Sequence, residues 1–247
     1  TLIAFAGTGA AACGSDATTA GTALSTGATS AAEAVPASAP TPTTTPAAGS
    51  TVVFADALDD DRNGWGIINS PQYGTTSYEA GDYVWNFMGS NAHWLASTVG
   101  DQFDHGTLDM LDVTVHADVT VESGGGVVGV FCRENPGTNA EFQWYEFVLR
   151  DEYAAIRRAD SEGNIKPLAE THDVTAPLGQ SLALEGSCVG SGDDAALAMR
   201  LNGTELLTAT DDDHPLVNGA AGMQAYTFPV HEQMMIRWHD FSVEHAG

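Results

Sequence analysis

The sequence predicts an all-β fold in which two antiparallel sheets pack face to face as a jelly-roll sandwich, preceded by a disordered N-terminal tether. Residues 111–122 indicate this most clearly, because Val113, Val115 and Val119 alternate with polar residues, as in a strand with one buried face. Further short apolar segments follow at regular spacing, separated by Gly, Asn and Asp. No segment of the domain has the apolar period of an amphipathic helix, so we expect two sheets of about six strands each.

The connections between these segments carry the residues that tight turns require. Asn202-Gly203 separates two strand-like segments by two residues, which is typical of a hairpin. Gly124-Gly125-Gly126 ends the long alternating segment in the same way. We therefore expect strands at residues 111–122, 127–133, 142–150, 153–158, 181–188, 195–201, 204–210, 219–226 and 233–243.

Residues 1–13 predict the end of a bacterial secretion signal. Ala10-Ala11-Ala12-Cys13 resembles a lipobox, with Ala10 at the position where a lipobox usually has Leu. We expect Cys13 to carry a lipid, which would make the protein a secreted, membrane-anchored lipoprotein of the bacterial cell envelope. An ordinary signal peptide with an unrelated cysteine is the alternative. The lipid would be the only membrane contact, because no later segment has about 18 consecutive apolar residues.

Residues 14–50 predict a disordered linker. They are almost entirely Ala, Thr, Ser, Gly and Pro, and Asp16 and Glu33 are their only charges. Such a composition lacks the large apolar side chains that offset the entropy of ordering the chain. Residues 51–247 contain all five Trp and form one β-sandwich domain in this interpretation.

The charge balance argues against a nucleic-acid partner. The chain has 8 Lys and Arg against 33 Asp and Glu, a formal net charge of −25 at pH 7. A chain this acidic repels phosphate backbones and anionic lipid surfaces. The acidic residues either keep the protein soluble or hold cations.

The three cysteines indicate one disulfide. If Cys13 carries a lipid, Cys132 and Cys188 remain as a pair without a leftover thiol. A metal site made of two cysteines alone would be incomplete. Alternation turns both side chains inward, and we expect them to join strands that lie next to each other.

The domain resembles the concanavalin A-like lectin and glucanase β-sandwiches, in particular the LamG-like branch that includes 3-keto-disaccharide hydrolase domains. The resemblance implies a curved sandwich whose concave sheet often binds glycans. The segments that carry it are Phe54-Ala55-Asp56, Asn63-Gly64-Trp65, Gly129-Val130-Phe131-Cys132-Arg133, Tyr145-Glu146-Phe147, Leu201-Asn202-Gly203-Thr204-Glu205-Leu206 and Trp238-His239-Asp240-Phe241-Ser242-Val243.

The sequence offers few candidates for catalytic residues. The Glu-x-Asp-x-x-Glu strand motif of the glucanase members is absent from the sequence. His116, Asp118 and Glu122 share the polar face of the long alternating segment and could transfer protons, although such residues are more often the solvent side of a half-buried strand. Glu146 is the other candidate carboxylate. The sequence leaves enzymatic activity undecided.

A calcium loop is the one cofactor site that the sequence suggests. Asp59, Asp61, Asn63 and Gly64 reproduce the first half of an EF-hand-type loop, in which alternate oxygens converge on one ion. Ser70 occupies the position of the bidentate Glu, so the second half is missing. An ordinary polar loop is the alternative.

A ligand-binding patch is predicted from strand parity. If Val130 and Cys132 point inward, Phe131 and Arg133 point outward; on residues 142–150 the same rule turns Trp144, Glu146 and Arg150 outward. Aromatic rings stack on the apolar faces of sugars, and Arg and Glu hydrogen-bond their hydroxyl groups. A cross-strand ladder of ion pairs is the alternative.

These observations lead to one main hypothesis and two alternatives. The main hypothesis is a lipid-anchored envelope protein whose sandwich binds a carbohydrate or another polar envelope ligand without catalysis. The first alternative is a glycoside hydrolase of the 3-keto-disaccharide type, with Glu146 or Asp118 as its catalytic group. The second is a structural or adhesive surface module without a small-molecule site.

Overall fold

The structure is a computed structural model that describes residues 51–246, except residues 72, 89–93, 99–109, 137–141, 161, 163, 191 and 229–232. The predictions for Cys13 and for the linker at residues 14–50 lie outside the described residues. Within the described ranges the regular elements are all strands, in agreement with the predicted all-β class. None of the described residues forms a helix long and apolar enough to cross a membrane.

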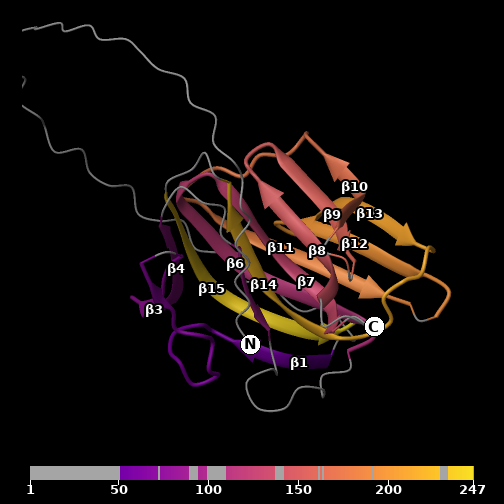
Figure 1. The fold of residues 1–247 in the computed structure, drawn as a ribbon, viewed down its shortest axis with the longest axis horizontal. Coiled ribbons are helices and arrows are strands. Elements are labelled where there is room, and N and C mark those ends of the chain that lie inside the picture. Colours follow the sequence, from indigo (N-terminus) through magenta and orange to yellow (C-terminus); the bar gives the residue numbers. More distant parts are fainter. Residues whose placement is uncertain are drawn as a thin grey trace, which may run out of the picture.

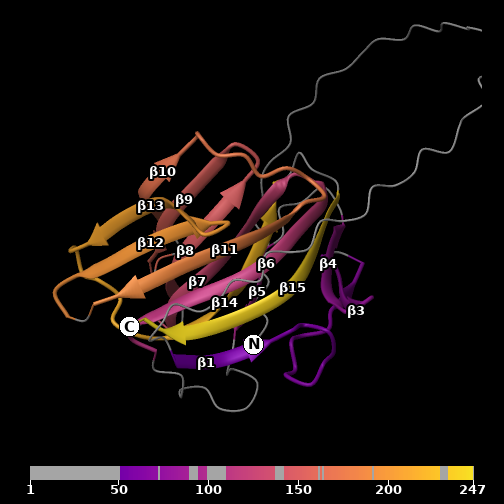
Figure 2. The ribbon, with the colours of Figure 1, turned by 180° about the vertical axis from the view of Figure 1, so that it is seen from behind.

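The strands form two antiparallel sheets that pack face to face, seen from opposite sides in Figures 1 and 2. The larger sheet has nine strands, and β1 (Thr51–Asp56) joins it by pairing with β15. The other eight follow the order β13 (Thr204–Asp211), β12 (Ala195–Leu201), β11 (Ser181–Val189), β6 (Val113–Gly124), β15 (Gln233–His245), β4 (Asp82–Met88), β3 (Gly74–Glu79) and β2 (Asn69–Ser70).

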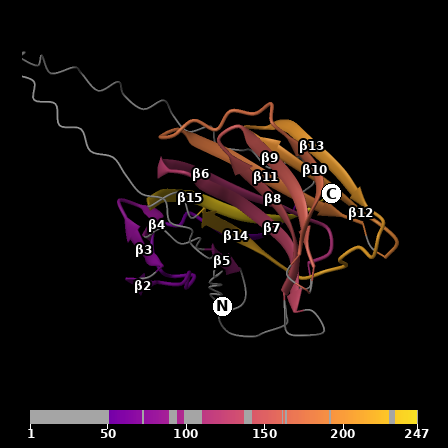
Figure 3. The ribbon, with the colours of Figure 1, turned by 45° about the horizontal axis from the view of Figure 1, so that its top comes forward.

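The smaller sheet has six strands. Their order is β10 (Ile165–Thr171), β9 (Tyr153–Ala159), β8 (Phe142–Arg150), β7 (Gly126–Pro136), β14 (Ala220–Thr227) and β5 (Trp94–Thr98). The expectation of two sheets of equal size is wrong, because β1 to β4 all add to the larger sheet. β3 and β4 lie at the end of the molecule away from β10 and β13 (Figure 3).

The hydrophobic core lies between the two sheets. The alternation of β6 buries Val115 and Val119, and they belong to the same cluster as Trp238 of β15 and Phe147 of β8. Burying apolar side chains of this size stabilises a fold by roughly 1.5–3 kcal/mol each. The inward-facing residues that the sequence pattern predicted for β6 are therefore confirmed as core.

The Asn202-Gly203 hairpin is confirmed between β12 and β13. The φ angles of Asn202 and Gly203 are 53° and 77°, the left-handed values that a two-residue hairpin turn of this kind requires. The Asn202 side chain also accepts a hydrogen bond from the backbone N–H of Ala183 on β11, at 3.0 Å. The turn is thus tied to the neighbouring strand as well as closing its own hairpin.

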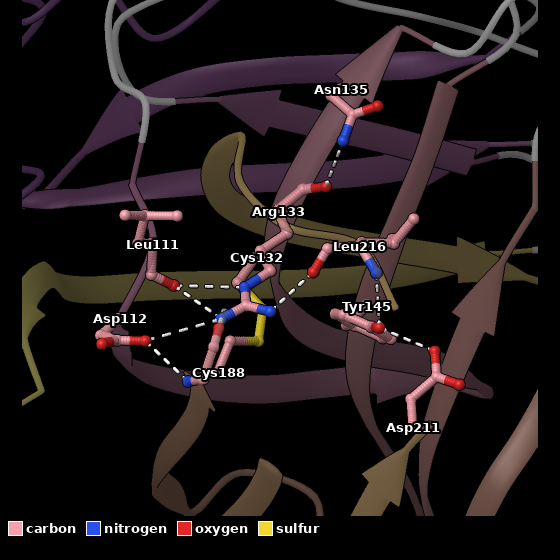
Figure 4. Close-up of a disulfide and its surroundings, with 10 residues drawn as sticks. Leu111, Asp112, Cys132, Arg133, Asn135, Tyr145, Cys188, Asp211 and Leu216 are labelled. Carbon is pink, nitrogen blue, oxygen red and sulfur yellow. Dashed lines mark hydrogen bonds and ion pairs between the residues drawn. A yellow bond between two sulfur atoms is a disulfide. The ribbon is translucent and has the colours of Figure 1, made fainter. Parts of the chain in front are cut away.

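Cys132 and Cys188 form a disulfide, as predicted, with their Cα atoms 6.7 Å apart. The bond links β7 of the six-stranded sheet to β11 of the nine-stranded sheet (Figure 4). It therefore crosses the sandwich, whereas the sequence analysis placed it between neighbouring strands. Disulfides of this kind are typical of proteins that fold outside a reducing cytoplasm.

Candidate functional site

The candidate site is the outward side of the six-stranded sheet, which we call the aromatic–arginine face. On β8 the residues Tyr145, Phe147 and Leu149 point into the core, so period two turns the residues between them outward. The register places Arg157 of β9 opposite Glu146, and Tyr153 opposite Arg150. The face consists of Trp144, Glu146, Arg150, Tyr153, Arg157, Gln224, Tyr226 and Phe228.

Glu146 is the centre of this face and is only 1% exposed. Its carboxylate lies 2.6 Å from Nε of Arg157. It accepts hydrogen bonds from Nε2 of Gln224 at 2.6 Å and from Nε1 of Trp144 at 3.3 Å. A buried carboxylate requires such donors to offset the loss of water. One carboxylate thus contacts side chains of its own strand β8, of β9 and of β14, which lies beyond β7 in the same sheet.

Tyr226 of β14 adds an aromatic ring to the aromatic–arginine face next to Arg157. Nη2 of Arg157 donates a hydrogen bond to its hydroxyl, and the Arg157 guanidinium lies 5.6 Å from the centre of the Tyr226 ring. Burial raises the pKa of the Tyr226 hydroxyl to about 12, so this group remains protonated. Tyr226 therefore offers a half-buried ring with a fixed hydroxyl.

Arg150 lies at the end of β8, between two aromatic rings. Its guanidinium carbon is 5.4 Å from the centre of the Tyr153 ring and 5.2 Å from that of Phe228. In the part of the chain that the structure describes, no acidic side chain lies within ion-pair distance of this exposed guanidinium. Its donors can therefore reach a ligand without breaking a described ion pair.

The side chains of the two other predicted patch residues are buried. Phe131 shares the outward face, because its Cα pairs with that of Glu146, but the side chain is 1% exposed. The expectation that Phe131 is an exposed contact residue is therefore wrong. The expectation that Arg133 points outward beside it is also wrong, since its side chain is fully buried.

Arg133 is turned away by an irregularity in β7. The pairing of β7 with β8 shifts between Cys132 and Asn135, and Arg133 has a φ of 55°. A bulge of this kind re-aims the side chain, so the simple alternation ends before this residue. The guanidinium donates to three backbone carbonyls next to the disulfide, those of Leu111, Gly190 and Leu216. Figure 4 shows the contacts with Leu111 and Leu216.

The two candidate catalytic carboxylates lie on opposite sides of the sandwich. Glu146 is on the outward face of the six-stranded sheet, and Asp118 is on the outward face of the nine-stranded sheet, where its Cα pairs with that of Asp240. Burial and the charge of Asp240 raise the pKa of Asp118 to about 6. Glycosidases need two carboxylates on the two sides of one bond, so these two cannot act as a pair.

The nine-stranded sheet also carries a chain of polar contacts that the sequence analysis missed. Nε2 of His239 is 2.7 Å from the hydroxyl of Thr120, and its Nδ1 is 2.7 Å from the carboxylate of Asp82. The sequence of hydroxyl, imidazole and carboxylate is the one found in the catalytic triad of hydrolases. Thr120, however, is a mid-strand residue that is only 8% exposed, which favours a cross-link between β6, β15 and β4.

The predicted calcium loop is an exposed turn. Arg62 forms ion pairs with Asp59 and Asp60 at 3.0 and 2.7 Å, and the backbone N–H of Gly64 donates to the carbonyl of Asp61. Nowhere in the described ranges do three or more His, Cys, Asp or Glu side chains form a group that could hold a metal ion. Calcium binding by Asp59, Asp61 and Asn63 stays a prediction.

The remaining residues of the aromatic–arginine face can be identified only from the way the strands pair. The sequence analysis did not include Arg157, Gln224 and Tyr226 in the patch. They become neighbours of Glu146 only through the pairing of β8 with β9 and of β7 with β14. Period two within each strand places these side chains on a face but does not say which strands lie side by side.

No protein-family model matches the chain, and no curated protein sequence is significantly similar to it. Several solved structures share its fold. A Bacillus subtilis protein of unknown function with a galectin-like fold has 12% identity and a TM-score of 0.57, over 78% of this chain and 96% of its own. SCLam, a non-specific endo-β-1,3(4)-glucanase from family GH16, has 11% identity and a TM-score of 0.54, over 80% and 92%.

The carbohydrate recognition domain of Emp47p is a further similar structure. It has 10% identity and a TM-score of 0.52, over 82% of this chain and all of its own. Identities this low show the fold alone. The chain therefore has the concanavalin A-like lectin and glucanase β-sandwich fold, as its sequence resemblance implied.

Proposed function

We propose that the protein is a non-catalytic binding module and that its aromatic–arginine face binds carbohydrate. The observation that carries this proposal is the arrangement around Glu146. One buried carboxylate holds a guanidinium, an amide and an indole on a single outward sheet face. Half-exposed aromatic rings surround this polar centre.

The chemistry of the face suits a sugar. Trp144, Tyr153 and Tyr226 are partly exposed rings on which the C–H faces of a sugar ring can stack. Arg150 and Arg157 supply planar sets of N–H donors for hydroxyl oxygens. A polar ligand of the envelope that combines rings and hydroxyl groups would meet the same contacts.

Glu146 acts in this proposal as a positioning residue. Its side chain is too buried to contact a ligand, but it orients Arg157 and Trp144, which are partly exposed. A site whose contact residues are fixed before binding loses less conformational entropy when the ligand arrives.

The similar structures support the same class of ligand. One is described as a carbohydrate recognition domain and another as an endo-β-1,3(4)-glucanase. Both descriptions concern proteins that interact with sugars on this fold. Fold similarity alone is an analogy, so the proposal depends on the side chains described above.

A glycoside hydrolase of the 3-keto-disaccharide type is less well supported. Glu146 and Asp118 lie on opposite sheets, and the Glu146 carboxylate is already ion-paired with Arg157 and hydrogen-bonded by Gln224 and Trp144. A structural or adhesive module would have no use for the exposed guanidinium of Arg150 between two rings.

We further propose that the protein works outside the cytoplasm, held to the envelope by a lipid on Cys13. The disulfide between Cys132 and Cys188 supports the extracytoplasmic part of this proposal. Mass spectrometry of the membrane fraction, for the wild-type protein and for Cys13→Ser, tests the anchor. A mass gain equal to a diacylglyceryl group in the wild type alone is the expected result.

A glycan array followed by calorimetric titration of the best glycan tests the binding proposal. We expect the wild-type protein to bind, and Trp144→Ala to bind at least about tenfold more weakly, a loss of ~1.4 kcal/mol. Arg200→Ala is the matched control, because Arg200 is an exposed residue of the other sheet. Binding to no glycan, or equal binding by Trp144→Ala, would overturn the proposal. Turnover of the bound glycan would favour the hydrolase instead.

A further inference from the structure

The two ends of the sandwich differ. One end is closed by the disulfide and by Arg133, whose guanidinium donates to carbonyls of three separate segments. β7 and β8 run from that end to the opposite one, where Gly126 begins β7 and Arg150 ends β8. A cavity of about 650 Å³ lies at this second end.

The floor of the cavity is apolar. It is formed by the ends of four strands, two from each sheet: Val121 of β6, Val128 of β7, Leu149 of β8 and Leu182 of β11. The turn at residues 124–126 borders the space with three glycines, which fill none of it with side chains. The volume lies within the roughly 300–1,000 Å³ range of pockets that bind small molecules.

The connection from β10 to β11 forms one wall of the cavity, to which it contributes His172, Ala176 and Leu178. Backbone hydrogen bonds tie it to the turn between β8 and β9 and to β6. The N–H of Ala176 donates to the carbonyl of Asp151 at 3.0 Å, and that of Gly179 donates to the carbonyl of Val121 at 2.9 Å. Between these ties lies Leu178, a lining residue that is 57% exposed. An exposed leucine at the mouth of an apolar cavity is the contact that an apolar ligand would cover.

The rim of the cavity carries groups of mixed charge. Arg150, Asp151, Glu152 and His172 line it, so the rim offers both hydrogen-bond donors and acceptors. Hydroxyl groups both donate and accept, so they match such a rim better than a charged group does. An anion would also meet the strongly negative field of a chain with a net charge of −25.

We propose that this cavity binds the apolar group of a neutral amphiphile, namely the alkyl or aryl aglycone of a glycoside whose sugar lies on the aromatic–arginine face. Arg150 joins the two regions, since it lines the cavity and contacts the rings of Tyr153 and Phe228. This inference rests on the proposed function and extends it, because it names an apolar part of the ligand that a free sugar lacks.

Methyl-group NMR tests the inference, with protein labelled at the Leu and Val methyl carbons. The probes are octyl β-glucoside below its micelle concentration, methyl β-glucoside and octan-1-ol. We expect octyl β-glucoside to bind at least about tenfold tighter than methyl β-glucoside, because each buried CH₂ contributes roughly 0.8 kcal/mol. Its chain should shift the methyl signals of Leu178, Leu182 and Val121, and leave those of Leu197 and Val243 in place.

Two matched variants locate the binding. Leu178→Trp narrows the mouth of the cavity, so we expect at least tenfold weaker binding of octyl β-glucoside. Ile67→Trp makes the same kind of change at a residue that is also exposed but does not line the cavity, and should bind like the wild type. Because both residues are exposed, both variants should fold.

The outcomes separate this inference from the proposed function. If glycans bind in a Trp144-dependent way while the octyl chain adds no affinity and shifts no cavity methyl signal, the cavity inference is overturned and the proposed function remains. If octan-1-ol and octyl β-glucoside shift the same cavity signals while no glycan binds, the apolar site is supported and the sugar-binding function fails.

Discussion

Glu146 and Arg157 face each other across β8 and β9, and Nε of Arg157 lies 2.6 Å from the Glu146 carboxylate. Both side chains are largely withdrawn from water, so each depends on the other to offset the cost of burying its charge. The pair therefore belongs both to the stability of the fold and to the shape of the candidate site.

Glu146→Gln leaves the Arg157 guanidinium buried without its counter-charge. We expect the free energy of unfolding to fall by about 2–3 kcal/mol, because removing one partner of a buried pair leaves an uncompensated charge. Urea unfolding followed by tryptophan fluorescence measures it. The double variant Glu146→Gln/Arg157→Gln should recover part of the loss. A loss below about 0.5 kcal/mol would show that the pair is effectively solvated.

Arg133→Lys tests the closed end of the sandwich. The guanidinium reaches the carbonyls of Leu111, Gly190 and Leu216 together, which the single ammonium of lysine cannot do. We expect a loss of about 2–4 kcal/mol, because buried acceptors lose their donors. Arg200→Lys, at an exposed ion pair with Glu185, is the control and should change stability by less than about 0.5 kcal/mol. Similar losses in both variants would contradict this role.

Removing the disulfide tests the link between the sheets. Cys132 and Cys188 are 56 residues apart in sequence. In the chain-entropy account, closing a loop of this length stabilises the folded state by roughly 4 kcal/mol. Cys132→Ala/Cys188→Ala should therefore unfold at lower denaturant concentration than the oxidised wild type. The reduced wild type is the control and should behave like the double variant; no difference among the three would refute the expectation.

Much of the sandwich could be predicted from local patterns, because β6 and β11 each bury one face and alternate over most of their length. The N-terminal strands could not. In β4 the consecutive residues Tyr83, Val84 and Trp85 are all buried, so both faces of the strand are covered and the period-two signal disappears. For the same reason the sequence underestimated the size of the larger sheet.

The candidate site was predictable only in part. Parity within β8 grouped Trp144, Glu146 and Arg150 correctly, because no irregularity interrupts that strand. Arg133 was misplaced, since a bulge changes parity and leaves no unambiguous mark in the sequence. Arg157 reaches Glu146 through strand pairing, which depends on long-range packing and not on local spacing.

Asp118 predicts how stability depends on pH. Burial, and then the charge of Asp240, raise the pKa of Asp118 from 3.8 to about 6, so the folded state binds this proton more tightly than the unfolded state. The contribution of the Asp118 carboxyl to the free energy of unfolding is therefore greatest below about pH 4, and it is lost as the pH rises through about 6. Asp118→Asn mimics the protonated form at every pH.

We therefore expect Asp118→Asn to be more stable than the wild type at pH 7. The gain should be on the order of 1 kcal/mol, since partial exposure to solvent reduces the full effect of the pKa shift. The difference should shrink toward zero as the pH falls from about 6 to about 4, where the wild-type carboxyl becomes protonated. Urea unfolding of both proteins between pH 4 and 8 measures this. A gain that stayed constant across that range would show that it does not come from the charge of Asp118.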